Sequence, residues 1–150
     1  MDDVSIEVAS SKDVPIIIGL LYDLGRPKPQ KDSDVDTFRK LVKKYITSSN
    51  TKILVAKLDD VKIIGMVSLV FLPRLNRTTL ELYIPELVVL EKYQNQGIGT
   101  KLMNSCIALA KEKNCHRIRL ESGNQRKESH RFYTNLGFEQ YALSFTKNLN

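Results

Sequence analysis

The stretch Gln94-Asn95-Gln96-Gly97-Ile98-Gly99-Thr100 joins a β-rich run to a long helical pattern, and its residue types suit the binding of phosphate. The first N–H groups of a helix lack intrahelical partners and lie at the positive end of the helix dipole, so they attract anions. Gly97 and Gly99 carry no side chain that would keep a diphosphate away from the backbone, and Thr100 adds a hydroxyl. The segment therefore predicts a cradle for a phosphate-bearing ligand.

Two other phosphate-binding patterns do not match this loop. A dinucleotide-binding turn of the Rossmann type needs a third glycine at position 102, where the sequence has Leu102. A P-loop needs a Gly-Lys pair, whereas Gly99 is followed by Thr100 and the lysine comes at position 101. A plain glycine loop between a strand and a helix remains the alternative.

The chain that contains this loop is of moderate size, with 150 residues. Of these, 42% are hydrophobic and 27% are charged. A chain of this length buries about two-thirds of its unfolded surface. No internal repeat or low-complexity tract interrupts it. We therefore expect a single domain over residues 1–150, built around one core.

Changes in hydrophobic period predict the elements of that domain. Ser10-Ser11 offers a cap for a first helix, and Ser33 or Asp34 offers one for a second. Pro85 removes one backbone donor from a β-rich run, so pairing should be interrupted near it. Gly137 is positioned to end the last helix. The expected strands cover residues 6–9, 52–58, 62–72, 79–90, 117–122 and 138–146, with two helices after the first strand, one after the glycine loop and one before Gly137.

This order predicts an α/β fold of the mixed α+β kind. Antiparallel hairpins come first, and a strand, helix, strand unit that needs parallel neighbours follows. We expect one mixed sheet of about six or seven strands, with helices covering both faces.

The formal charge of +6, from 23 basic and 17 acidic side chains, suits an anionic ligand, a phosphate-rich cofactor or nucleic acid. The basic residues are scattered, without a run of five and without interleaved aromatic residues, which argues against nucleic acid. No apolar run approaches the roughly 18 residues of a membrane span, and the acidic start of the chain differs from a signal peptide. A cytoplasmic protein with no membrane partner is expected.

The cysteine and histidine residues do not predict a metal site. Cys106 and Cys115 lack CxxC spacing and are interpreted as structural thiols. His116 and His130 have no spaced carboxylate or thiol partner, and His130 is interpreted as a packing or hydrogen-bonding residue.

Three separated segments together resemble the GNAT N-acetyltransferases. Gln94-x-x-Gly97-x-Gly99 after the strand 86–89 is similar to the acetyl-CoA motif of that family. Ser122-Gly123-Asn124, then His130-Arg131-Phe132-Tyr133 and Leu136-Gly137-Phe138, are similar to its second cofactor segment in order and spacing. The resemblance covers roughly residues 60–147. Within the family, the segment 86–133 and the ending 144–147 are similar to those of aminoalkylphosphonate N-acetyltransferases.

The resemblance implies a mostly antiparallel central sheet with a splay between its fourth and fifth strands, which carry Val89 and Leu120. It also implies that the pantetheine arm of acetyl-CoA fills the splay and that an amine attacks the thioester directly, in a ternary complex. A backbone N–H near Val88 or Val89 would meet the oxyanion. The implied cofactor-binding residues are Leu87, Val88, Val89, Gln94, Asn95, Gln96, Gly97, Ile98, Gly99, Thr100, Asn124, Arg126 and Tyr133.

Two residues are the candidates for proton transfer. Tyr133 matches the family position of the acid that protonates the leaving thiolate, and its alternative is a core tyrosine beside Phe132 and Leu136. Glu86 is the candidate base, directly or through water, or the anchor of the ammonium; its alternative is a surface charge. Because alternate strand residues share a face, Glu86 and Val88 are expected to point together toward the substrate side.

Further residues are candidates for binding the cofactor or the acceptor amine. Asn124 is a candidate for bonding the pantetheine or for a simple turn cap, and Arg126, Lys127 and Arg131 are candidates for meeting phosphates. A small polar or anionic amine is expected, with a protein lysine or N-terminus as one alternative and a non-catalytic acyl-CoA sensor as another. A monomer or homodimer is expected. Five basic residues lie in the two loops expected near the acceptor, where they either receive an anionic substrate or are simply solvated. They are Arg26, Lys28, Lys31, Arg74 and Arg77.

Overall fold

The computed structural model describes residues 3–25 and 27–150. These residues divide into two compact units, one ending at Arg119 and the other covering Leu120–Asn150, and each is described by itself. Among the described residues, no helix has both the length and the hydropathy needed to span a membrane. The expectation of a single domain over residues 1–150 stays a prediction.

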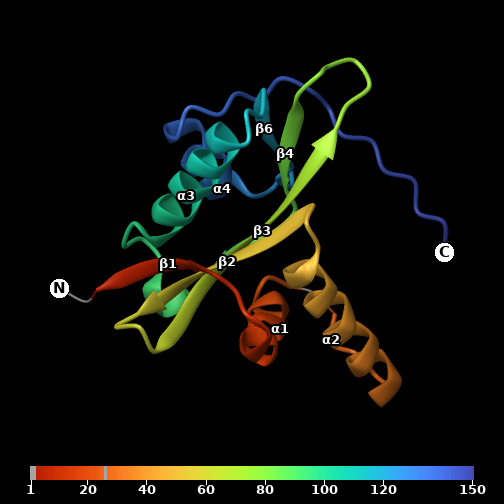
Figure 1. Cartoon of the computed structure of the whole chain (residues 1–150), viewed down its shortest axis with the longest axis vertical. Coiled ribbons are helices and arrows are strands. Elements are labelled where there is room, and N and C mark those ends of the chain that lie inside the picture. Colours follow the sequence, from red (N-terminus) through yellow and green to blue (C-terminus); the bar gives the residue numbers. More distant parts are fainter. Residues whose placement is uncertain (1–2, 26) are drawn as a thin grey trace. The chain divides into compact units, whose positions relative to one another are not determined.

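The first unit is built on a six-stranded sheet (Figure 1). Its strands follow the spatial order β1-β2-β3-β4-β6, and β5 pairs with β3 off this path. The pairings β1–β2, β2–β3, β3–β4 and β3–β5 are all antiparallel. The predicted mixed, mostly antiparallel sheet is thereby confirmed. The strands are β1 (Val4–Val8), β2 (Thr51–Leu58), β3 (Lys62–Pro73), β4 (Leu80–Ile84), β5 (Leu87–Val89) and β6 (Arg117–Leu120).

Three longer helices accompany this sheet: α1 (Val14–Asp23), α2 (Asp32–Thr47) and α3 (Ile98–Glu112). The chain enters α1 through a short 3₁₀ turn closed by a capping box, in which the Ser10 N–H donates to the Asp13 carboxylate at 2.9 Å. The predicted cap of α2 at Ser33 or Asp34 is wrong. Lys31 is the last extended residue, and the Asp34 N–H already bonds the Lys31 carbonyl at 3.0 Å, so the helix begins earlier.

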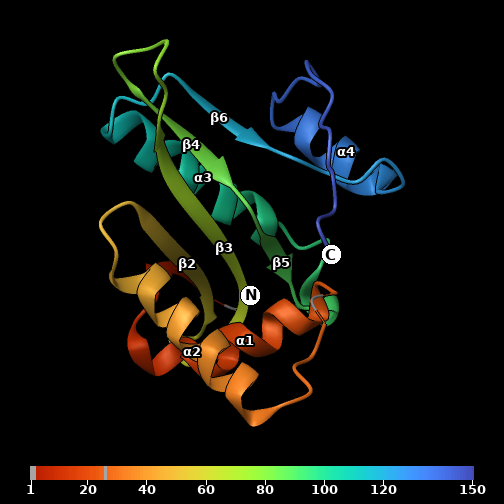
Figure 2. The same ribbon diagram turned by 90° about the vertical axis from the view of Figure 1, so that its right-hand side faces the viewer.

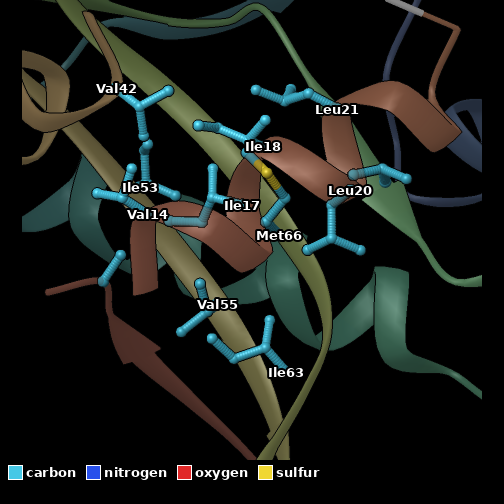
Figure 3. Packing of buried hydrophobic residues seen from close by; sticks show 12 residues of the cluster. Val14, Ile17, Ile18, Leu20, Leu21, Val42, Ile53, Val55, Ile63 and Met66 are labelled. Carbon is cyan, nitrogen blue, oxygen red and sulfur yellow. The ribbon is translucent and has the colours of Figure 1, made fainter. Parts of the chain in front are cut away.

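The main core of this unit lies between α1, α2 and one face of the sheet (Figure 3). Ile17 and Ile18 of α1 pack with Ile53 of β2 and Met66 of β3, and Val42 of α2 closes the cluster. Helix α3 contacts β3 as well, and its own buried stripe is Ile98, Leu102, Met103, Cys106 and Ala110. Helices therefore cover both faces, as predicted (Figure 1).

The second unit contains one helix, α4 (Lys127–Asn135). Gly137 follows it with φ of +92°, the left-handed conformation expected where a helix ends. The predicted strand over 138–146 is wrong, because these residues form no regular element. Alternation stabilises a strand when one face is buried, whereas Tyr141, Leu143 and Phe145 are all exposed.

Candidate active site

The predicted interruption at Pro85 is present, and it divides one β-rich run into β4 and β5. Both pieces pair with β3, one after the other along its length (Figure 2). β6 is placed next to β4, whereas β5 pairs with β3 alone among the described strands. The expected splay beyond Pro85 is therefore confirmed, since β5 keeps one edge that is not part of the sheet ladder.

The hydrogen-bond pattern decides which backbone groups occupy that edge. The Ser68 N–H donates to the Glu86 carbonyl at 2.9 Å, and the Leu90 N–H donates to the Ile64 carbonyl at 2.9 Å. In an antiparallel pair the bonded positions alternate, so Glu86, Val88 and Leu90 face β3. The N–H and C=O groups of Leu87 and Val89 consequently point away from β3.

The glycine loop follows β5 through a short 3₁₀ turn over Glu91–Tyr93. The Gln94 side-chain amide donates to the Val89 carbonyl at 2.9 Å, which ties the loop to the open edge of β5. Asn95 and Gly97 have φ of +62° and +83°, and α3 begins at Ile98. The turn therefore directs the first N–H groups of α3 toward the exposed loop, an arrangement that suits an anion.

Glu86 is held at the start of β5 by Ser68 of β3. The Ser68 hydroxyl donates to the Glu86 carboxylate and accepts the Glu86 N–H at 3.0 Å. Burial, followed by the charge of Glu86 and a contribution from Tyr83, raises the pKa of Tyr45 to about 12. The Glu86 carboxylate thus lies in a corner formed by β3 and α2. Val88 is 7% exposed and packs in the core. The expectation that its side chain points toward an open substrate side is therefore wrong.

A second carboxylate, Glu81 of β4, is fully buried among three arginines. It binds Arg74 at 3.0 Å, Arg119 at 3.3 Å and Arg117 through a shorter contact. Burial alone would raise the pKa of Glu81, but the Arg117 hydrogen bond and the three guanidinium charges outweigh it, so the pKa is lowered. Arg119 also lies over the Tyr83 ring at 4.6 Å.

In the second unit, Tyr133 is half-buried between two aromatic rings, with centroids 5.2 Å away for Phe132 and 5.9 Å away for Phe138. Burial raises the pKa of Tyr133, and the Arg126 charge opposes the rise. The phenol therefore stays protonated at neutral pH. Asn124 is exposed in the turn before α4.

The histidines have protein partners. A ring nitrogen of His130 lies 2.7 Å from the Gly123 carbonyl, which confirms the hydrogen-bonding role predicted for it. The His116 ring lies 3.0 Å from the Thr79 hydroxyl. Over residues 3–25 and 27–150, no group of three or more His, Cys, Asp or Glu side chains could hold a metal ion.

The basic loop residues do not gather at one point. Lys28 and Lys31 line a shallow cavity of about 400 Å³ formed by the loop 27–31 and the start of α2, and Lys28 lies 5.9 Å from the Tyr22 ring centroid. Arg74 is held by Glu81, whereas Arg77 donates its N–H to the Arg74 carbonyl in the turn before β4. Arg26 lies outside the described residues.

Sequence reasoning missed Ser68, Tyr45 and the Glu81 cluster. Ser68 is the one polar residue within an apolar stretch of the strand 62–73, and that was its available signal. Glu81 stands between apolar neighbours in the same way. Neither signal names a partner, because the partners come from other elements of the sheet.

Comparison with known proteins gives one family. Residues 19–138 match the family model described as the acetyltransferase (GNAT) family. An N-alpha-acetyltransferase 30 of Schizosaccharomyces pombe is 30% identical over 122 residues, which are 81% of this chain and 79% of that protein. An aminoalkylphosphonate N-acetyltransferase of Salmonella typhimurium is 27% identical over 141 residues, or 94% and 88% of the two chains.

A solved structure agrees over nearly the whole chain. The crystal structure of a transcriptional regulator from Bacillus halodurans matches with a TM-score of 0.88 and 27% identity, covering 98% of this chain and 100% of that one.

Proposed function

Because the chain belongs to the GNAT acetyltransferase family, we propose that it transfers the acetyl group of acetyl-CoA to the primary amine of a small polar or anionic acceptor. The family and the N-acetyltransferase relatives establish the class of enzyme. Acetyl-CoA, the donor used by this family, supplies a thioester that an amine can attack directly. The acceptor and the roles of individual residues are the proposal.

One observation supports the proposed acetyl-CoA site: the open edge of β5 is followed, after one short turn, by the glycine loop at the start of α3. The N–H groups at the start of α3 suit a diphosphate, and Gly97 and Gly99 leave the backbone accessible. The Leu87 and Val89 backbone groups suit an extended amide-bearing arm, which would add hydrogen bonds as a strand does. These residues fit the donor of the family.

The alternation of hydrogen bonds along β5 indicates which backbone N–H is available to donate to the thioester oxygen. The Val88 N–H faces β3, so we propose the outward N–H of Val89 for this role. A backbone N–H held by the ladder on its other side costs little reorganisation when charge develops on the oxygen.

Glu86 is the proposed base or ammonium anchor. A primary amine is mostly protonated at neutral pH and must lose a proton before it attacks. The Glu86 carboxylate follows the strand interruption directly and is held in one orientation by Ser68, which suits a group that takes a proton directly or through one water.

Tyr133 is the proposed acid that protonates the leaving thiolate. Its raised pKa keeps the phenol protonated at neutral pH, so a proton is available. Its position in the sequence motif supports this role, and its packing between Phe132 and Phe138 holds the ring in place.

The names of two relatives support different acceptors. The name of the Salmonella protein supports an anionic amine, and the charge of +6 agrees with it. The name of the yeast protein supports the alternative, the N-terminus of a protein. The chain spans more of the Salmonella protein than of the yeast one, so the small anionic amine is preferred.

The test is thiol release from acetyl-CoA with a panel of amines, checked by mass spectrometry of the products. Aminoalkylphosphonates are compared with alkylamines of matched length that lack the anion, and with peptides that have free N-termini. We expect the highest kcat/KM for the anionic amines. Turnover of peptides alone would replace the small-molecule acceptor by the protein alternative. Tight binding of coenzyme A without turnover of any amine would favour the sensor, a function that suits the name of the Bacillus structure.

A further inference from the structure

Ser68 is a polar residue in the most deeply buried strand of the sheet. It is 3% exposed, and its neighbours in β3 from Ile63 to Phe71 are almost all apolar and buried. A buried hydroxyl is costly unless it forms hydrogen bonds, so its partners indicate why it is there. Both of its side-chain bonds go to one residue, Glu86.

The Ser68 hydroxyl uses both of its hydrogen-bonding capacities on Glu86. As an acceptor it takes the Glu86 N–H at 3.0 Å, and as a donor it bonds the Oε2 atom of the carboxylate. The Ser68 N–H adds a third bond, to the Glu86 carbonyl at 2.9 Å. One side chain thus fixes the main chain and the carboxylate of Glu86 together.

This arrangement matters because Glu86 follows Pro85, where the strand is interrupted. Proline has no N–H, and no β4 or β5 ladder position covers Pro85 or Glu86. The Ser68 hydroxyl supplies the acceptor that the Glu86 N–H would otherwise lack at this break. Without it, the start of β5 and the direction of the carboxylate would both be less constrained.

We propose that Ser68 is a positioning residue for acetyl transfer, which holds the Glu86 carboxylate in one orientation toward the acceptor amine. The inference rests on the proposed role of Glu86 as base or ammonium anchor. A hydroxyl that bonds both the carboxylate and the N–H of one residue restricts the side-chain rotamer and the main chain of that residue together. Among the described residues, Tyr45 of α2 interacts electrostatically with both Glu86 and Tyr83 of β4.

A set of five variants tests this inference in the full chain. Ser68→Ala removes the hydroxyl. Ser68→Thr and Ser68→Val are a matched pair, since they have nearly the same volume and both add a methyl group, but only Thr keeps the hydroxyl. Glu86→Gln, alone and combined with Ser68→Ala, completes a double-mutant cycle.

We expect Ser68→Ala and Ser68→Val to lower kcat/KM for the amine by about 10-fold or more, since a hydrogen bond to a charged group is of that strength. Ser68→Thr should lie closer to the wild-type protein than Ser68→Val does. Binding of coenzyme A should change little in all of them.

The cycle separates the two proposals. If Ser68 acts through Glu86, then Ser68→Ala has no further effect on kcat/KM in the Glu86→Gln background. Additive losses, or equal activities for the Thr and Val variants, would overturn the role of Ser68. Full activity of Glu86→Gln alone would instead overturn the proposed role of Glu86. Circular dichroism and thermal unfolding identify any variant that fails to fold, and the Thr/Val comparison then decides.

Discussion

Gly65 of β3 lies opposite Val89 of β5, and a Cβ atom at position 65 would lie 3.0 Å from the carbonyl oxygen of Val88. The same atom would be 3.4 Å from Leu102 of α3 and 3.4 Å from the Val89 side chain. Glycine therefore allows β3, β5 and α3 to approach closely at the last residue of β5, just before the chain turns into the glycine loop. This close approach fixes where the proposed donor site can be.

Gly65→Ala should displace β5 and weaken the donor site. We expect a loss of about 1–3 kcal/mol in the free energy of unfolding, as is typical of overpacking, and a raised KM for acetyl-CoA. Gly19→Ala is the control, because a Cβ there meets nothing within 4 Å and α1 should be slightly stabilised. Chemical denaturation and steady-state kinetics measure both effects. Wild-type KM in Gly65→Ala would contradict the dependence on close approach.

A charge at position 97 tests the anion cradle. Gly97→Asp and Gly97→Asn have similar shapes, and both residues tolerate the positive φ of this position better than most others. Because only Asp adds negative charge, it should weaken coenzyme A binding by about 10-fold more than Asn does, and added salt should reduce the difference. Isothermal titration calorimetry provides both dissociation constants. Equal affinities would show that no phosphate lies near this loop.

Removing the carboxylate of Glu86 should lower the rate of acetyl transfer. We expect Glu86→Gln to reduce kcat/KM by about 100-fold, which is the lower range for the loss of a general base, with a smaller loss at high pH where the free amine is present. Glu91→Gln, at an exposed carboxylate just after β5, is the matched control and should stay at the wild-type rate. Equal rates for the two variants across pH would exclude Glu86 from proton transfer.

The Tyr133 phenol should matter most for turnover. Tyr133→Phe keeps the ring contacts with Phe132 and Phe138 but removes the proton, so kcat should fall by about 10- to 100-fold with little change in stability. Tyr141→Phe, at an exposed ring, is the control. The loss should be smaller for an acetyl donor with a more acidic thiol, which needs less protonation. Unchanged kcat at every pH would assign Tyr133 to packing alone.

The buried Glu81 should make the free energy of unfolding depend on pH in the acid range. Its folded-state pKa is lowered below 4.5, so its contribution is fully present above pH 4.5 and is lost as pH falls through the folded value. Glu81→Gln should cost about 3–5 kcal/mol and flatten this acid dependence, because three arginines lose their carboxylate partner. Asp36→Asn removes an exposed pair with Arg39 and should have almost no effect. Urea unfolding between pH 3 and 7 compares them.

Local patterns along the chain determined much of this protein. The β-rich runs over 52–58 and 62–72, the break at Pro85 and the glycine loop before Ile98 each predicted the element that is present. Helices, turns and strand breaks depend on backbone preferences and periodicities within a few residues. The proposed donor loop was recognisable for the same reason, since the start of a helix suits an anion without help from distant residues.

The tertiary structure decided what distant residues do to one another. The predicted strand over 138–146 failed because alternation says nothing about whether a partner buries one face. The register of β3 against β5 turns the Val88 N–H toward β3 and leaves the Val89 N–H on the open edge, and it brings Ser68 onto Glu86 across 18 positions of sequence. A register shift of one residue would reverse every side chain and backbone group of β5, so these pairings exist only once the strands are aligned.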